Sequence, residues 1–451
     1  MEKYIELIKQ KLSTGEKKRA AVVTFGCQQN EADSEKLRGM AAAMGYEITD
    51  DVKLADLIVV NTCAVREHAE QKALSIIGQY KHLKAEKPEL LIGVCGCMVA
   101  QKHRVEQLKN SYPYVSFSFE PSSLDRFPEI LFGVMEKHGR AFSIGENARE
   151  ISEGVPVLRD GSAKAWVSIM YGCNNFCSYC IVPYVRDRER SREYKYVVQE
   201  VRELVESGVK EITLLGQNVN SYNGGCSFAE LLEKLSEIEG DYILRFMTSH
   251  PKDVSDELIS VMAKSGHVAK QFHLPLQSGS DSVLKVMNRH YDRAHYLDNV
   301  RKLREAMPSI TLTTDIIVGF PGETEEDYLQ TEALVKEVDY ASAFTFVYSP
   351  RQGTKAAEME NQIPEDVQKD RIMRLVELVN SLTRQKSEKY VGKTIEILCE
   401  DYDEKKDLCM GRDEFGRMGY FKSAKESIGQ FVKLKITRAN GISLYGERVE
   451  E

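Results

Sequence analysis

The stretch Tyr171-Gly-Cys-Asn-Asn-Phe-Cys-Ser-Tyr-Cys180 places three cysteines in one short loop, with the spacing Cys-x3-Cys-x2-Cys. Cys173, Cys177 and Cys180 offer three thiolates, whereas a structural zinc site takes four ligands, and no fourth Cys or His follows within finger-like distance. A [4Fe-4S] cluster bound at three corners keeps its fourth iron free for a small-molecule ligand. The spacing therefore favours an iron–sulfur cluster with one open iron over three buried structural cysteines.

This cysteine loop follows the first of six apolar segments that alternate with helical stretches. The expected strands are 166–170, 211–215, 242–246, 271–274, 311–318 and 344–347. Helices are expected between them, for example over 197–207 and 324–335, and Thr324 with Asp327 suits a capping box at the second of these. Six units instead of eight predict an open, partial (β/α)6 TIM-like barrel, with its chemistry at the carboxyl ends of the strands.

Polar and glycine-rich sequences follow several of these strands. They are Gly216-Gln-Asn218, Thr248-Ser-His250, Gln277-Ser-Gly279 and Gly319-Phe-Pro-Gly-Glu323. Glycine permits close backbone approach to a ligand, and amides or carboxylates can hold an amino acid or a ribose, although the same residues also form ordinary turns. His250 and His273 are assigned no catalytic role, so no catalytic residue is predicted beyond the candidate cluster ligands.

The region from 18 to 150 predicts a doubly wound, parallel α/β domain, because continuous apolar strands alternate with helices. The expected strands are 20–25, 56–60, 90–94 and 115–117, with helices over 33–44, from 67 and from 101. Cys27, Cys63 and Cys97 fall just beyond the carboxyl ends of three successive strands, the edge where such sheets bind ligands. They form a second candidate triad, with chance placement as the alternative. Whether Cys95 is packed or competes as a ligand stays open.

The last part of the chain changes character. A crossover linker is expected over 150–159, and a charged helix over 364–390 closes the central domain. Short strands are then expected at 394–398, 408–410, 419–421, 431–436 and 442–445. Such a pattern predicts a small OB-like β-barrel, a frequent nucleic-acid platform. Cys226, Cys399 and Cys409 lack ligand spacing and are interpreted as structural.

Composition limits the possible classes of protein. The 451 residues predict two or three domains, and 42% hydrophobic with 29% charged residues indicates a folded, globular chain. The N-terminus does not resemble a signal peptide and no apolar run is long enough to span a bilayer, so we expect no membrane association and a cytoplasmic location. In that reducing environment the 10 cysteines are expected as ligands or free thiols.

The net charge of −8 argues against indiscriminate nucleic-acid binding, but one local patch stands out. Four arginines alternate with other residues just after the cysteine loop: Arg186, Arg188, Arg190 and Arg192. They are candidates for RNA contact. A salt-bridged surface strand or loop explains the alternation with Asp187 and Glu189 equally well.

Taken together, these motifs resemble the radical S-adenosylmethionine (SAM) methylthiotransferases, most closely the tRNA dimethylallyladenosine methylthiotransferases of the MiaB type. The resemblance covers nearly the whole chain. It is carried by Thr24–Glu31, Asn61–Glu67, Gly96–Gln101, Tyr171–Arg192, His273–Gly279 and Gly319–Thr324. The family implies an N-terminal extension over 1–17, the α/β domain over 18–150, the radical SAM partial barrel over 151–388 and a TRAM-like RNA-binding barrel over 389–451.

The resemblance also implies cofactors, ligands and partners. Cys173, Cys177 and Cys180 would hold the SAM-cleaving [4Fe-4S] cluster, and Cys27, Cys63 and Cys97 an auxiliary one. Residues expected to contact SAM are Tyr179, Gln217, Gln277 and Gly319. The substrate would be the anticodon arm of tRNA, where a methylthio group is added to carbon-2 of dimethylallyladenosine at position 37. Two SAM molecules, an electron donor such as flavodoxin or ferredoxin, and a monomeric protein complete the expectation.

Two departures from the family pattern stand out: Gln29 stands where the family usually has Met, and Asp187 stands where it often has Gly. The second departure affects how the arginine run meets its substrate. Three alternatives share these features. Two are sister methylthiotransferases, one acting on threonylcarbamoyladenosine in tRNA and one on an aspartate of a ribosomal protein. The third is a non-catalytic, metal-bound RNA-binding module.

Overall fold

The computed structural model describes residues 1–65, 67–143, 151–159, 161 and 163–449. Arg66 of the Asn61–Glu67 motif and the start of the predicted linker lie outside these residues. The chain forms two compact units. The first comprises Met1–Asp160, Tyr171–Asn174 and Cys180–Arg190, and the second comprises Gly161–Met170, Asn175–Tyr179 and Ser191–Glu451. The cysteine loop is therefore divided: Cys173 and Cys180 belong to the first unit, and Cys177 belongs to the second.

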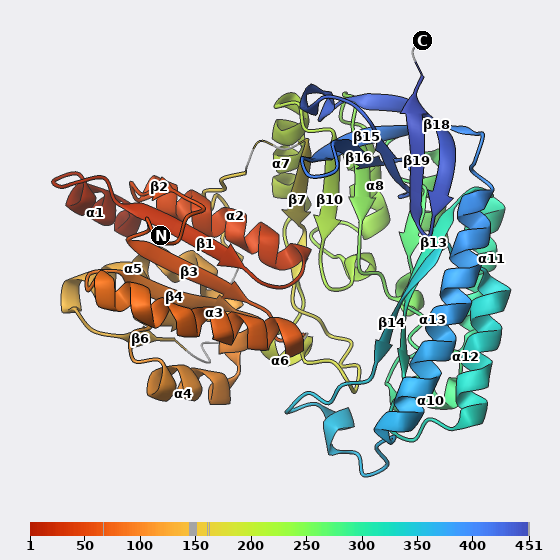
Figure 1. Ribbon diagram of the computed structural model, residues 1–451, viewed down its shortest axis with the longest axis horizontal. Helices are drawn as coiled ribbons and strands as arrows, with labels where there is room; N and C mark the ends of the chain where they lie inside the picture. Colours follow the sequence, from red (N-terminus) through yellow and green to blue (C-terminus); the bar gives the residue numbers. More distant parts are fainter. Residues whose placement is uncertain (66, 144–150, 160, 162, 450–451) are drawn as a thin grey trace. The chain divides into compact units, whose positions relative to one another are not determined.

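The first unit contains a parallel six-stranded sheet of order β2-β1-β3-β4-β5-β6 (Figure 1). Its strands are β1 (Arg19–Thr24), β2 (Glu47–Ile48), β3 (Leu57–Thr62), β4 (Leu91–Gly96), β5 (Phe117–Phe119) and β6 (Ala141–Phe142). The helices are α1 (Glu2–Leu12), α2 (Gln28–Ala43), α3 (Glu67–Glu86), α4 (Lys102–Ser111) and α5 (Phe127–Lys137). The doubly wound parallel fold predicted from the sequence is confirmed.

Both faces of this sheet are buried, which explains why its strands read as continuous apolar runs. Leu57 packs with residues of α1, α2 and α5 on one face, whereas its neighbour Ile58 packs with residues of α3 and α4 on the other. The predicted strands lie within about two residues of the observed ones. The helix expected to begin at 33 begins at Gln28, because Cys27 already serves as its N-cap directly after the strand.

The second unit contains six parallel strands in two three-stranded sheets, β11-β10-β7 and β12-β13-β14. Their bounds are β7 (Lys164–Ser168), β10 (Glu211–Leu215), β11 (Ile243–Phe246), β12 (Gln271–His273), β13 (Thr311–Val318) and β14 (Ser342–Val347). The chain order of these strands follows their spatial order, as a partial (β/α)6 barrel requires. One predicted strand is interrupted at Ile169, after which β8 (Met170–Tyr171) pairs with β9 (Arg190–Ser191) and leads into the cysteine loop.

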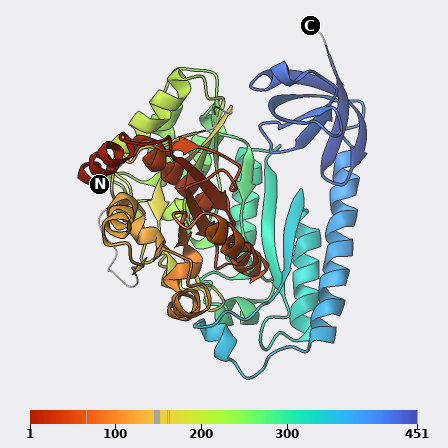
Figure 2. The same ribbon diagram turned by 60° about the vertical axis from the view of Figure 1, so that its left-hand side comes forward.

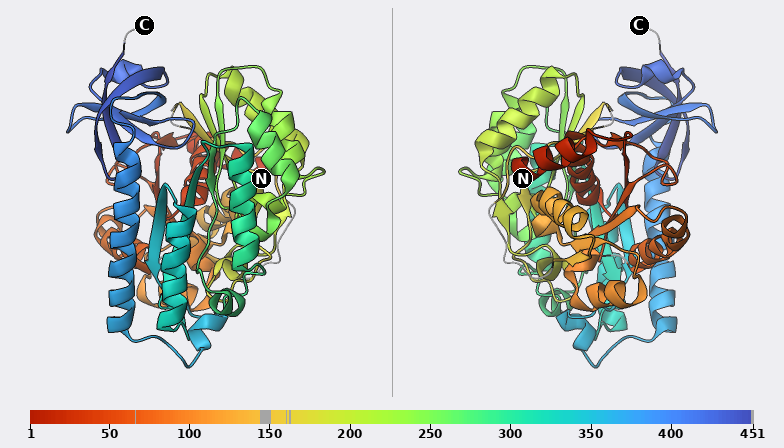
Figure 3. Two further views of the ribbon diagram at one scale, coloured as in Figure 1. Left: turned by 90° about the vertical axis from the view of Figure 1, so that its right-hand side faces the viewer. Right: turned by 90° about the vertical axis from the view of Figure 1, so that its left-hand side faces the viewer.

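Helices cover the outer surface of these strands (Figure 3). They are α7 (Tyr194–Glu206), α8 (Phe228–Ser236), α9 (Asp256–Lys264), α10 (Asp281–Val286), α11 (Arg293–Ala306), α12 (Glu325–Val338) and α13 (Glu365–Glu388). The capping box predicted at Thr324 and Asp327 opens α12. In the described part of the chain, no helix combines the length and apolar character that a membrane span needs.

Helix α13 leads into a closed five-stranded barrel of order β15-β16-β17-β19-β18 (Figure 2). Its strands are β15 (Thr394–Asp403), β16 (Leu408–Arg412), β17 (Met418–Phe421), β18 (Phe431–Asn440) and β19 (Ser443–Arg448). Cys399 and Cys409 lie in its apolar core, whereas Cys226 is half-buried against the core of the central strands. The small β-barrel predicted from the short strands is confirmed.

This barrel docks on the amino ends of the central strands through buried ion pairs. Arg412 contacts Glu211 at 2.7 Å and Glu400 at 2.8 Å, while Lys164 reaches Glu400 at 3.0 Å. Glu211 and Lys164 are the first residues of β10 and β7. The barrel therefore lies at the strand edge opposite to the one from which the cysteine loop emerges.

Candidate cluster and cofactor sites

Three cysteines of the first unit follow the carboxyl ends of three adjacent strands. Cys27 caps α2 after β1, Cys63 follows β3, and Cys97 follows β4. Burial raises the pKa of Cys97 to about 11; Arg186 opposes this effect, while the nearby Cys63 and Cys27 add to it. The three thiols are therefore close enough to influence one another electrostatically, and their role as ligands of one cluster stays a prediction.

Asparagine side chains hold these strand ends together. The Asn30 amide donates to Asn61 Oδ1 at 3.2 Å and to the Thr62 carbonyl at 2.9 Å, and the Asn61 amide returns a bond to the Asn30 carbonyl at 2.8 Å. Gly96 has φ +93°, and a Cβ there would lie 2.3 Å from the Thr62 carbonyl oxygen, so only glycine fits. The position of Cys97 is fixed by this backbone approach.

Cys95 does not join the triad. Its side chain packs in the apolar cluster that includes Phe117 and Phe119, on one face of the sheet. Burial raises the pKa of the Cys95 thiol well above its usual value, which favours the neutral form. This resolves the question that the sequence left open: Cys95 is packed.

Arg186 lies inside the first unit beside Cys97. Its Nε donates to Cys97 Sγ at 3.1 Å, and its Nη2 donates to Asp33 Oδ2 at 2.9 Å and to Asn30 Oδ1 at 3.2 Å. Burial lowers the pKa of this guanidinium, but Cys97 and Asp33 raise it above its usual value. A buried cation beside the thiols suits an anionic thiolate cluster.

The three thiols of the first unit can be set against the ligand needs of a single metal ion and of an iron–sulfur cluster. Among the described residues, no three His, Cys, Asp or Glu side chains converge in the way that a single metal ion requires. The irons of a [4Fe-4S] cluster occupy separate corners, so its thiolates stand further apart than the ligands of one ion. Three neighbouring thiols with a buried arginine therefore fit a cluster better than mononuclear zinc.

The first part of the second candidate site packs within the first unit. Gly172 has φ +72°, and a Cβ there would lie 2.1 Å from the Arg188 carbonyl oxygen. The Cys173 N–H donates to the Asp187 carbonyl at 3.1 Å, and the Glu189 N–H donates to Asn174 Oδ1 at 3.2 Å. The arginine run thus forms the backbone support of the cysteine loop.

The middle of this loop packs within the second unit. The Ser178 N–H donates to the Met287 carbonyl at 3.0 Å, and the Asn288 amide donates to the Phe176 carbonyl at 3.0 Å. Arg289 Nη1 donates to Cys177 Sγ at 3.2 Å in a buried contact. Each candidate triad therefore has one cysteine that accepts a hydrogen bond from a buried arginine.

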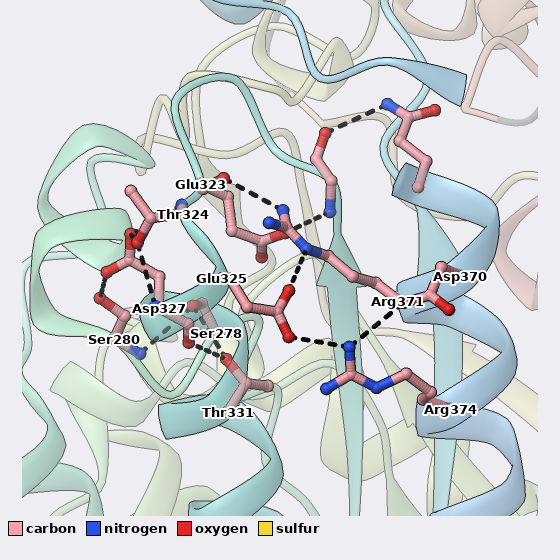
Figure 4. Close-up of polar contacts among 12 residues, drawn as sticks. Ser278, Ser280, Glu323, Thr324, Glu325, Asp327, Thr331, Asp370, Arg371 and Arg374 are labelled. Atoms are coloured by element: carbon pink, nitrogen blue, oxygen red, sulfur yellow. Dashed lines mark hydrogen bonds and ion pairs between the residues drawn. The ribbon is translucent and has the colours of Figure 1, made fainter. Parts of the chain in front are cut away.

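Two residues predicted to contact SAM are brought near each other. The ring of Tyr179 lies edge-on to Phe320 with centroids 6.4 Å apart, and Phe320 directly follows Gly319. Glu323 fixes this loop: its Oε2 accepts from the Gly319 N–H at 2.6 Å and from Arg371 Nη1 at 2.8 Å (Figure 4). Burial raises the pKa of Glu323 to about 7, opposed by these two donors.

Gln277, another predicted contact, follows β12 in a strained conformation with φ +69°. Its loop is tied to α12 by the Gly279 N–H, which donates to Thr331 Oγ1 at 2.9 Å. Ser280 also donates to Asp327 (Figure 4). Thr248 after β11 is also strained, with φ +67°, an outlier for a β-branched residue. Such strain is concentrated at functional sites, which supports this strand edge as the site.

Buried polar atoms without partners gather at the ends of β10 and β11. In the described residues they are Asn218 Oδ1, both amide atoms of Asn220, Ser249 Oγ and His250 Nε2. Burial lowers the pKa of His250 to about 2, so its ring is neutral. Unsatisfied polar groups of this kind call for a polar ligand or water. Gln217, half-buried beside Asn218, is the fourth predicted contact, so this edge fits the polar groups of SAM.

The four arginines predicted to contact RNA divide into two pairs. Arg186 and Arg192 are buried, and Arg192 binds Glu200 at 2.7 Å and the Ser168 carbonyl at 2.9 Å. These two side chains are therefore internal, which corrects the expectation of a four-arginine surface. Arg188 is exposed, and Arg190 lines an open pocket in the first unit together with Lys36 and Tyr171.

The sequence did not predict that two arginines, Arg186 and Arg289, contact the cysteines. Arg289 lies in a short connection between two helices, where nothing in the local pattern distinguishes it from a surface arginine. Arg186 was noticed, but its alternation with acidic residues suggested a surface position. Asp33, its partner, carried no signal beyond its place in a helix.

Comparisons with known proteins follow the same division of the chain. Residues 167–335 match the radical SAM superfamily, residues 19–120 match the uncharacterized protein family UPF0004, and residues 388–449 match the TRAM domain. Among solved structures, the radical SAM methyltransferase TsrM from Kitasatospora setae has a TM-score of 0.56 at 15% identity, covering 76% of this chain and 77% of that chain. The cobalamin-dependent enzyme OxsB has a TM-score of 0.55 at 13% identity, covering 81% and 56%. These define the fold class, that of radical SAM proteins.

Curated relatives define the family. The tRNA-2-methylthio-N(6)-dimethylallyladenosine synthase of Clostridium perfringens is 49% identical over 440 residues, covering 96% of this chain and 98% of the relative. The protein of that name from Caldicellulosiruptor saccharolyticus is 48% identical over 437 residues, covering 96% and 93%. The chain therefore belongs to the family of tRNA-2-methylthio-N(6)-dimethylallyladenosine synthases.

Proposed function

We propose that the protein is a radical SAM methylthiotransferase that adds a methylthio group to carbon-2 of dimethylallyladenosine at position 37 of tRNA. The identity of about half of all residues to relatives of that name, over nearly the whole chain, supports this function. The family uses SAM and [4Fe-4S] clusters. Breaking an unactivated carbon–hydrogen bond is beyond any side-chain acid or base at neutral pH, and when bound these cofactors supply that chemistry.

The single structural observation that carries the proposal is a contact between the two cysteine regions. Ile181, which directly follows Cys180, packs in one apolar cluster with Cys97, Ala64 and Val185. Both Cys180 and the Cys27–Cys63–Cys97 triad belong to the same compact unit. This packing within the first unit supports two neighbouring clusters that serve one substrate.

The residues of each site have defined tasks in this proposal. Cys173, Cys177 and Cys180 would hold the SAM-cleaving cluster, and Cys27, Cys63 and Cys97 the auxiliary one. Tyr179 and the Gly319 backbone would contact the adenine of SAM, while Gln217, Gln277 and the unpartnered atoms of Asn218, Ser249 and His250 would hold its polar groups. The ordered loops exclude water around these groups.

An apolar surface on β14 supports the dimethylallyl substrate over the threonylcarbamoyl one. Phe344 and Phe346 are 56% and 39% exposed, and they pair with Asp315 and Ile317 of β13 on the face opposite to the buried Ile316. The helices pack on the Ile316 face, so the phenylalanines point into the open barrel. An apolar appendage gains by covering such rings, whereas a charged one does not.

The C-terminal barrel offers a platform for RNA bases. Tyr420 and Tyr445 are stacked with centroids 5.1 Å apart, and the Arg438 guanidinium lies 4.1 Å above the Tyr445 ring. Aromatic rings with a neighbouring cation bind unstacked bases. Because the barrel docks at the amino ends of the strands, RNA must run along them to reach the carboxyl edge, about 26 Å for the 8 residues of β13. We therefore propose the anticodon arm as the element that spans this length.

Arg188 and Arg190 remain proposed RNA contacts, and the domain boundaries predicted from the sequence are kept as part of the proposal. An electron donor such as flavodoxin or ferredoxin, a monomeric state and a cytoplasmic location complete it. The electron donor follows from the proposed chemistry, because radical formation needs one electron, and the location follows from tRNA as the substrate.

Mass spectrometry of tRNA nucleosides tests the function directly. A strain that lacks the gene should accumulate dimethylallyladenosine without its methylthio group, and the wild-type gene should restore the modification. Restoration of a methylthio group on threonylcarbamoyladenosine instead would identify the sister activity. No change in any nucleoside would contradict the proposal.

Filter binding of tRNA tests the platform. Replacing Tyr445→Ala should weaken binding about tenfold, since stacking of one base on a ring contributes about 1–3 kcal/mol. Tyr445→Phe keeps the ring and serves as the matched control, with binding near that of the wild type. Equal binding by the Ala variant would remove the barrel face from the proposal.

A further inference from the structure

Arg289 is a buried cation whose surroundings lack a compensating carboxylate. It lies between α10 and α11, where Asn288 and His290 both have positive φ, and its side chain is 5% exposed. Its guanidinium donates to Cys177 Sγ at 3.2 Å, to the Pro275 carbonyl at 3.3 Å and to Tyr291 Oη at 3.3 Å. Among the described residues, no carboxylate forms an ion pair with it.

This arrangement is costly unless an anion is present. Removing a charge from water carries a large free-energy penalty, which an oppositely charged neighbour offsets. The only ionisable groups among the three hydrogen-bond partners of Arg289 are the Cys177 thiol and the Tyr291 hydroxyl. Burial raises the pKa of Tyr291, which keeps that hydroxyl neutral. The thiolate of Cys177, in a cluster of net negative charge, is the anion that fits.

Arg186 at the other triad differs in one respect. It also donates to a cysteine sulfur, Cys97 Sγ at 3.1 Å, but it forms a buried ion pair with Asp33 at 2.9 Å. The Asp33 carboxylate compensates the charge of Arg186, so this pair is neutral as a whole. The two triads therefore have the same hydrogen bond but a different balance of charge.

We propose that Arg289 is a positioning residue that holds Cys177 and raises the reduction potential of the SAM-cleaving cluster, while the Arg186–Asp33 pair leaves the auxiliary cluster at a lower potential. The inference rests on the proposed ligand assignment. Reduction adds one electron and one negative charge, so a nearby uncompensated cation favours the reduced form. The electron comes from a one-electron carrier, which is oxidised, and no bond or proton is transferred in this step. The charge difference directs that electron to the cluster that cleaves SAM.

Redox titration followed by electron paramagnetic resonance tests the proposal. Each cluster is measured in reconstituted full-length protein whose other three ligand cysteines are replaced by alanine, so that one signal is observed. Arg289→Gln keeps an N–H donor but removes the charge, and Arg289→Lys keeps the charge. Arg186→Gln combined with Asp33→Asn is the matched change at the auxiliary site, because it removes the charge-balanced pair as a whole. Iron content and SAM binding are measured alongside.

Arg289→Gln should lower the ratio of reduced to oxidised cluster at fixed potential about tenfold. This corresponds to a fall of about 59 mV in the reduction potential of a one-electron couple. Arg289→Lys should restore most of this shift, and the double change Arg186→Gln with Asp33→Asn, which removes two opposite charges, should produce a smaller one. An unchanged potential in Arg289→Gln with full iron content, or a larger shift in the double variant, would overturn the proposal.

Asp33→Asn provides a test that does not depend on how Arg289 variants fold. It leaves the Arg186 charge uncompensated, so the potential of the auxiliary cluster should rise by about the same tenfold ratio. No rise in a variant with full iron would contradict the role of charge balance. Absence of any cluster signal in the parent protein would instead contradict the proposed function itself.

Discussion

The two cysteine triads reach similar surroundings by different routes. Cys27, Cys63 and Cys97 come from three strand ends of one sheet, separated by 36 and 34 residues, whereas Cys173, Cys177 and Cys180 lie within eight residues of one loop. The sheet and its asparagine bonds hold the first triad, while the second lies in a loop whose residues divide between the two compact units. The comparison suggests that the auxiliary site depends on the fold of a single domain, and the SAM-cleaving site on the packing of a loop.

The largest expected effects come from removing each triad in turn. Replacing Cys173, Cys177 and Cys180 by alanine should halve the iron content and abolish SAM cleavage. Replacing Cys27, Cys63 and Cys97 should also halve the iron but leave reductive SAM cleavage, with no methylthio product. Iron analysis and chromatography of 5′-deoxyadenosine measure both. If the second variant also failed to cleave SAM while it kept its remaining cluster, the division of labour would be wrong.

Loss of the asparagine hydrogen bonds should destabilise the auxiliary site more than the site that contains Cys177. Asn30→Ala removes a buried amide that bonds to Asn61 and Thr62 and leaves their polar groups unsatisfied. The free energy of unfolding of the first unit should fall by about 1–3 kcal/mol. Denaturant unfolding measures this, and auxiliary iron should be lost before the Cys177 cluster. Equal loss of both clusters would contradict the dependence of one site on the sheet.

Glu323, in the loop after β13, should make the free energy of unfolding depend on pH. The pKa of Glu323 is raised by burial from 4.5 to about 7. The folded state therefore holds a proton that the unfolded chain has released, so stability should fall as pH rises from about 4.5 to about 7 and then level off. Glu323→Gln removes this titration. Denaturation of both proteins across this range should give a wild-type curve that declines relative to the variant, and parallel curves would exclude the effect.

The smallest effect is expected at Cys95. Because its thiol packs with Phe117 and Phe119 and not with the triad, Cys95→Ala should keep full iron and methylthio transfer, with a modest loss of stability. Cys97→Ala is the contrasting change, since it should remove the auxiliary cluster. Iron counts of the two variants decide the matter, and a cluster lost from Cys95→Ala would make Cys95 a ligand.

Much of this organisation could be predicted from the sequence because it depends on local pattern. Apolar runs located the strands to within about two residues, whereas the open-iron cluster that the spacing of Cys173, Cys177 and Cys180 indicates stays a prediction. The burial of Arg186 could not be predicted, since it depends on Asp33 and Cys97, which are distant in sequence. The contact between Arg289 and Cys177 could not be predicted for the same reason, since these two residues are also distant in sequence. The exposed rings of Phe344 and Phe346 become informative only when the register with β13 shows which face they occupy.

The central claim is that one chain carries two three-cysteine clusters. Iron and sulfide analysis of anaerobically reconstituted wild-type protein, with Mössbauer spectroscopy to identify the cluster type, tests it most directly. The account predicts about eight irons per chain in two [4Fe-4S] clusters. Four irons in a single cluster, or zinc in place of iron, would contradict it.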